Sequence, residues 1–245
     1  MKYMSSRRSY SSYNDGCAAA HALDLVGERW TLILVRELFL GPKRFAELQR
    51  DVIGISPTVL SRRLRDLESR GIVAHLTLPA PAHVDVYELT PWGLRLESVN
   101  KALSMWAVAS PTLPWDADMS PDTLVLAMRA HARVDATLAT PVRVNLFLAD
   151  SRIEESEPAS YSALVSQQGT TIEKAPTPGS ADAEVHATTA EWKACIIGGM
   201  ALGEMPDIRV IGSALAVDSL IRATNLEGNP EASRLASSDP EPRAR

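Results

Sequence analysis

The sequence predicts an α+β protein made of two domains, and three observations lead to this expectation. The chain has 245 residues, enough for two ordinary domains. Helix-like patterns with one pair of strand-like runs occupy its first part, whereas a second set of strand and helix patterns follows residue 120. Between them, the stretch SPTLPWDADMSPDT contains three prolines, which is typical of a linker. We therefore expect a flexible tail over residues 1–15, a first domain over 16–110, a linker over 111–120, a second domain over 121–226 and a disordered tail over 227–245.

Composition places the protein among soluble globular chains, with 45% hydrophobic and 22% charged residues. No apolar run approaches the roughly 18 residues of a membrane-spanning helix. The first 16 residues, MKYMSSRRSYSSYNDG, are polar and lack the apolar core of a signal peptide. The two cysteines, Cys17 and Cys195, have no metal or redox spacing, which fits a reducing compartment. We expect a cytoplasmic protein without a membrane partner.

Charge is unevenly distributed along the chain. Residues 1–115 carry 14 Lys and Arg against 11 Asp and Glu, whereas residues 116–245 carry 11 against 19. The net charge of −5 thus divides into +3 and −8. A basic part in an acidic chain indicates nucleic-acid affinity in that part.

Three short helices are predicted first, over Cys17–Gly27, Trp30–Leu40 and Arg44–Val52. Gly54 and Ile55 then turn the chain. Ser56 can cap the next helix, and Pro57 suits its first turn. This is the pattern of a helix-turn-helix.

The next helix, within GISPTVLSRRLRDLESRG, carries an apolar seam of Leu60, Leu64 and Leu67. Thr58, Arg62 and Arg65 lie on the opposite face. Arginine matches guanine O6/N7 or phosphate oxygens in a bidentate fork. Such a helix can equally be a solvated face with local ion pairs, and this helix alone does not decide between the two.

The continuation favours DNA binding. Two strand-like runs, Ile72–Leu78 and Val84–Leu89, flank PAPAH and predict a β-hairpin, so that the domain becomes a winged helix. A long helix then runs from Thr90 to Ala109. Its apolar face is expected to pair with a second copy, because a two-fold operator requires a dimer, although it can also close its own domain.

These segments resemble the HxlR family of bacterial winged-helix transcriptional regulators, through the motifs GERWTLILVREL, GPKRFAEL, GISPTVLSRRLRDLE and LTPWG. The resemblance implies a dimer on double-stranded DNA, with Pro57–Arg70 as the recognition helix. It departs from the family at Ala82–Asp85, where an arginine is usual, leaving His83 as the substitute. The expected DNA-binding residues are Lys43, Arg44, Ser56, Thr58, Ser61, Arg62, Arg65 and His83.

Cys17 has two interpretations. Some family members sense oxidants through the matching cysteine, and a position at a helix start lowers a thiol pKa. The alternative is a small buried hydrophobic residue.

The second domain is predicted to be a small α/β sandwich. Its last part, ADAEVHATTAEWKACIIGG, DIRVIG and SALAVDSLIRA, loosely resembles the sterol-carrier-protein type, which implies an apolar cavity. The candidate lining residues are Trp192, Ile196, Met200, Met205 and Leu220, all of which can also be ordinary core. No catalytic, phosphate-binding or metal-ligand motif occurs, so we expect neither an enzyme nor a cofactor.

The sequence therefore predicts a dimeric transcriptional regulator, a repressor, controlled by a hydrophobic small molecule in the second domain. The alternative is a carrier of lipids or hydrophobic metabolites whose first domain serves protein interaction.

Overall fold

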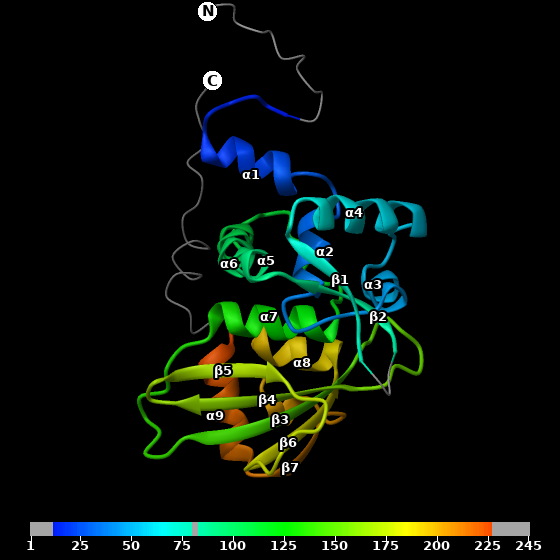
Figure 1. Ribbon diagram of the computed structural model, residues 1–245. Coiled ribbons are helices and arrows are strands. Elements are labelled where there is room, and N and C mark those ends of the chain that lie inside the picture. The colour runs from blue at the N-terminus through cyan, green and yellow to red at the C-terminus, as the bar shows by residue number, and fades with distance from the viewer. Residues whose placement is uncertain (1–11, 80–82, 227–245) are drawn as a thin grey trace, which may run out of the picture. The chain divides into compact units, whose positions relative to one another are not determined.

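The computed structural model of the protein describes residues 12–79 and 83–226 (Figure 1). The chain forms two compact units, residues 1–100 and 101–245, which are described separately. The predicted tail over residues 227–245 and most of that over 1–15 lie outside the described residues. The predicted domain and linker bounds stay predictions.

The first unit contains short helices followed by a hairpin. Its elements are α1 (Ala18–Val26), α2 (Thr31–Glu37), α3 (Phe45–Asp51), α4 (Pro57–Ser69), β1 (Val73–Thr77), β2 (Asp85–Leu89), α5 (Pro91–Leu94) and the start of α6 (Leu96–Ala107). Strands β1 and β2 pair antiparallel. The core consists of apolar side chains from α2, α3, α4 and the hairpin, with Leu34, Leu48, Leu60 and Leu64 almost completely buried.

The helix predicted over Thr90–Ala109 is wrong as a single element, since it divides into α5 and α6 at Arg95. Thr90 caps α5 by accepting a hydrogen bond from the Gly93 N–H at 3.0 Å. A Cβ on Gly93 would lie 2.1 Å from the Ile72 carbonyl oxygen, so α5 approaches the residue before β1 more closely than a side chain permits. This docking fixes the first turn separately from α6.

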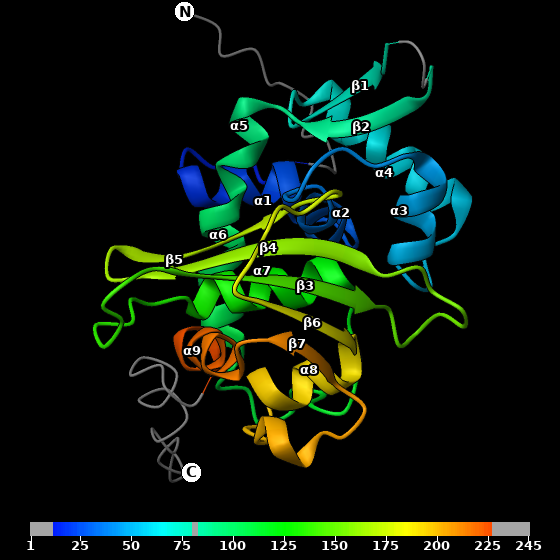
Figure 2. The same cartoon turned by 90° about the horizontal axis from the view of Figure 1, so that it is seen from below.

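The second unit is a five-stranded sheet covered by helices. Its elements are α7 (Pro121–His131), β3 (Val142–Ala149), β4 (Ala159–Ser166), β5 (Gly169–Lys174), β6 (Ala183–Thr188), α8 (Thr189–Ile196), a 3₁₀ turn (Leu202–Glu204), β7 (Arg209–Gly212) and α9 (Ala214–Thr224). The strand order is β5-β4-β3-β6-β7, visible in Figure 2. Only the β3–β6 pair is parallel; the other pairs are antiparallel.

Alternation along β3 explains how this sheet is buried. Val144, Leu146 and Leu148 are fully buried, and α8 and α9 pack against the sheet together with α7. Helix α8 is shorter than the predicted Thr189–Leu202, because it ends just before Gly198 and Gly199. The order of elements that suggested the sterol-carrier type is present, but the likeness itself stays a prediction.

Candidate nucleic-acid interface

The turn between α3 and α4 is built for a sharp change of direction. Gly54 has a φ of +88°, in the left-handed region that favours glycine. The Ser56 hydroxyl then accepts a hydrogen bond from the Val59 N–H at 3.4 Å, and Pro57 begins the helix. These residues end one helix and start the next within a few positions, as a helix-turn-helix requires.

Helix α4 has one buried and one exposed face, as its sequence predicts. Leu60, Leu64 and Leu67 are almost completely buried. Thr58, Arg62 and Arg65 are exposed. The Arg62 side chain keeps 65% of its surface exposed and lies 4.0 Å from Asp66, a loose surface pair. Arg65 donates from Nε to the carbonyl of its own helix at Ser61, at 3.3 Å. Both guanidinium groups are accessible to a ligand.

The other two arginines of this helix have structural roles. Arg63 is buried and donates to Glu28 at 2.6 Å and to Asp66 at 3.3 Å. Arg70 donates to the carbonyl of Leu25 in α1. Arg63 and Arg70 therefore hold α4 in the unit, whereas Arg62 and Arg65 face solvent.

Lys43 requires a correction. We expected it near the DNA backbone, but it is 5% exposed and its Nζ donates to Glu37 at 2.9 Å and Asp51 at 2.8 Å. Arg36 and Arg50 also pair with these two carboxylates. An ammonium group held by two buried carboxylates is not presented to a phosphate, so the expectation is wrong.

The remaining expected contacts differ in accessibility. Arg44, directly before α3, and Ser56 are exposed, whereas Ser61 is half-buried. His83 is exposed, has a φ of +39° and adjoins residues 80–82, which lie outside the described part of the chain. Their contacts with DNA stay predictions.

The wing carries a feature that the sequence analysis missed. His75 and Tyr87 are cross-strand partners whose rings stack with centroids 4.6 Å apart and planes within 8°. Burial, then the negative charges of Glu68 and Asp85, raise the pKa of Tyr87, which keeps its hydroxyl protonated. Only the pairing register reveals this stack, since the two residues are twelve positions apart.

The two cysteines lie in opposite environments. Cys17 is exposed at the N-cap of α1, where the backbone N–H groups of Ala20 and Ala19 lower its thiol pKa. Cys195 is buried, and burial raises its pKa. The interpretation of Cys17 as a small buried hydrophobic residue is therefore wrong.

The ligand-lining residues expected in the second unit do not share one environment. Trp192, Ile196 and Leu220 are core residues, and the Trp192 indole N–H donates to the Met128 sulfur at 3.4 Å. Met200 is 42% exposed, and Met205 is half-buried. For the first three, the alternative of ordinary core agrees with the structure.

Residues 12–79 and 83–226 contain no group of three His, Cys, Asp or Glu side chains placed to hold a metal ion. Within the same ranges, no helix has the length and apolar character needed to cross a membrane.

Comparison with known proteins identifies the family of the first part of the chain. The family model of the HxlR-like helix-turn-helix matches residues 25–111. The HTH-type transcriptional regulator YodB of Bacillus subtilis is 36% identical over 86 residues, which make up 35% of this chain and 77% of YodB. The chain belongs to the HxlR-like helix-turn-helix family. An uncharacterized HTH-type regulator of Mycobacterium tuberculosis, MT3179, is 38% identical over 38% of this chain and 58% of its own length.

Two solved structures of regulators align with a similar share of the chain. The reduced form of YodB is 33% identical, covers 39% of this chain and 95% of YodB, and has a TM-score of 0.36. The redox regulator HypR in its oxidized form is 30% identical, covers 40% of this chain and all of HypR, and has a TM-score of 0.37. As a member of this family, the protein is a DNA-binding transcriptional regulator.

Lys43→Met should destabilise the first unit by about 3–5 kcal/mol, because it leaves the buried carboxylates of Glu37 and Asp51 without their shared cation. Chemical denaturation followed by circular dichroism measures the free energy of unfolding. Arg44→Met, the matched change at the adjacent exposed position, should stay within about 0.5 kcal/mol of the wild type. A Lys43→Met protein as stable as the wild type would show that the cluster contributes no stability.

Cys17 should react with iodoacetamide at a lower pH than an ordinary cysteine, because its lowered pKa populates the thiolate there. Cys195 should require a higher pH, because its pKa is raised and its thiol is buried. Mass spectrometry of peptides from timed labelling at a series of pH values measures both rates in one sample, with Cys17→Ser as the control. Equal rates at every pH would contradict the assignment.

Proposed function

We propose that the protein is a repressor that binds a two-fold symmetric operator, with α4 in the major groove. The observation that carries this proposal is the division of α4 into a buried seam and an accessible face. The long donors of that face, Arg62 and Arg65, lie on successive turns with Thr58 before them. An arginine on such a helix can donate in bidentate fashion to guanine O6 and N7.

Contacts with DNA phosphates position α4 and are distinct from its contacts with the bases. Arg44 precedes α3 and is exposed, so we assign it to a DNA phosphate. The exposed Ser56 hydroxyl and the wing residue His83 are further candidates for backbone contacts. The strands of the wing add Asp85, whose charge opposes a phosphate contact at that point.

A homodimer is supported by the apolar face of α6. No residue of this helix is buried. Val99, Leu103 and Trp106 lie on one face of the helix and are 45%, 43% and 75% exposed. An apolar stripe of this kind indicates a protein interface. A two-fold dimer would present two α4 helices to half-sites about 34–36 Å apart.

Regulation has two candidate inputs, one in the second unit and one at Cys17. Repression follows where the operator overlaps a promoter, because a bound dimer excludes the polymerase. The second unit stays our proposed effector or assembly module, although the burial of Trp192 and Leu220 weakens the expected lining of its cavity. The exposed thiol of Cys17 supports a redox input as the other route. Family membership favours DNA binding over the alternative of a carrier.

Arg62→Ala or Arg65→Ala should weaken specific operator binding by about 1–3 kcal/mol, if that arginine donates to a guanine. Mobility-shift titration with DNA from upstream of the protein's own gene, against a scrambled duplex, measures the difference. Arg44→Ala should instead weaken both duplexes alike and reduce the salt slope by about one. Arg143→Ala, an exposed arginine of the second unit, is the control. If both α4 variants stay folded and bind operator like the wild type, the recognition face is misassigned.

The double change Leu103→Glu and Trp106→Glu should convert the dimer to a monomer, because it places charges in the apolar contact. Light scattering after size-exclusion chromatography gives the mass. Ser104→Glu, on the opposite face of α6, should leave the mass unchanged. A wild-type protein that is monomeric in solution, or a double variant that remains dimeric, would contradict this interface.

A further inference from the structure

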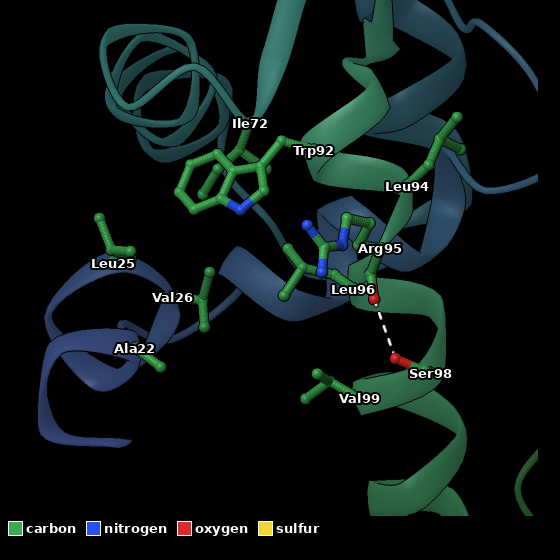
Figure 3. Close-up of a pocket in the computed structure, with 10 residues that line it drawn as sticks. All are labelled: Ala22, Leu25, Val26, Ile72, Trp92, Leu94, Arg95, Leu96, Ser98 and Val99. Atoms are coloured by element: carbon green, nitrogen blue, oxygen red, sulfur yellow. Dashed lines mark hydrogen bonds between the residues drawn. The ribbon is translucent and has the colours of Figure 1, made fainter. Parts of the chain in front are cut away.

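An open groove with a volume of about 610 Å³ lies at the surface of the first unit, between α1 and the segment that contains α5 and the start of α6 (Figure 3). Its size falls in the range of small-molecule sites. The walls are mainly apolar. Val26 lies on α1, Ile72 precedes β1, and Trp92 lies on α5. Val99 of α6, which also belongs to the proposed dimer face, completes this set. The groove is separate from the exposed face of α4.

Its chemistry is defined by one charged side chain. Arg95, at the break between α5 and α6, is the one charged residue among those that line the groove. Figure 3 shows its guanidinium group pointing from the break between α5 and α6 toward the α1 side of the groove, near Trp92. Arg95 is exposed, and within the described part of the chain its guanidinium forms no hydrogen bond or ion pair. The other polar side chain of the lining, Ser98, already donates its hydroxyl to the Arg95 carbonyl at 3.0 Å.

We propose that this groove binds a small organic anion with an apolar body, with Arg95 as the partner of its carboxylate. A guanidinium group offers a planar fork of donors that fits a carboxylate. The indole of Trp92, which is 48% exposed, and the aliphatic side chains around it would cover the apolar body. Charge complementarity with the unpaired arginine selects an anion over a neutral hydrophobic molecule.

The walls of the groove are attached to the recognition helix. Arg70, the C-cap of α4, donates to the carbonyl of Leu25 in α1. Thr90 donates its hydroxyl to the Gly71 carbonyl at 2.7 Å and its N–H to the Ile72 carbonyl at 3.0 Å. An occupant between α1 and α5 therefore contacts both elements that hold the end of α4.

The test uses 1-naphthoate and its neutral analogue 1-naphthamide as probes, titrated into the full-length protein by isothermal calorimetry without DNA. The wild type should bind 1-naphthoate with one site per chain and 1-naphthamide about 10- to 100-fold more weakly. Arg95→Gln should lose this preference by weakening only the naphthoate. Arg143→Gln, in the second unit, should behave as the wild type. Because no DNA is present, the result does not depend on the proposed operator binding.

Ala22→Trp should block both probes, because it places a large side chain at the α1 wall. This second variant tests the proposal even if Arg95→Gln fails to fold. The proposal is overturned if the wild type does not bind 1-naphthoate. This outcome is also expected if a second copy of the chain fills the groove. The proposal is also overturned if Arg95→Gln binds as tightly as the wild type, or if a folded Ala22→Trp still binds.

Discussion

The pairing of Lys43 with Glu37 and Asp51 is the interaction on which the DNA-binding unit depends. Glu37 ends α2 and Asp51 ends α3, so one ammonium group joins both helices. The backbone of the same residue pairs with Tyr87 of β2 in both directions, at 3.0 and 2.8 Å. The helix before α4 and the strand that completes the wing therefore meet at Lys43. A buried cation of this kind is tolerated because two carboxylates surround it.

Much of the first unit could be predicted from its sequence, because the decisive signals there are local. The leucine spacing of α4 fixes which face is buried, and Gly54, Ser56 and Pro57 mark the turn and the helix start. The role of Lys43 could not be predicted, because its partners come from elements six and eight residues away that only tertiary packing brings together. Beside Pro42 and Arg44, its sequence context is that of an exposed basic residue.

The difference between local signals and tertiary contacts also explains which other elements the sequence predicts. The strands of the second unit form where apolar and polar residues alternate in the sequence. The prediction for α8 is too long, because apolar residues continue past the glycines that follow the helix. The break at Arg95 depends on the approach of Gly93 to Ile72, a contact across 21 positions that no periodicity records. The groove around Arg95 could not be anticipated for that reason, since its walls come from three separated segments.

The hydrogen bonds that join the end of α4 to α1 and to Thr90 have a thermodynamic consequence. An occupant of the neighbouring groove that prefers one placement of these elements changes the affinity of α4 for DNA. By linkage, DNA changes the affinity for that occupant by the same factor. A coupling of about 1–3 kcal/mol corresponds to a factor of about 5 to 150 in either direction. The operator would then itself be an effector of the small-molecule site.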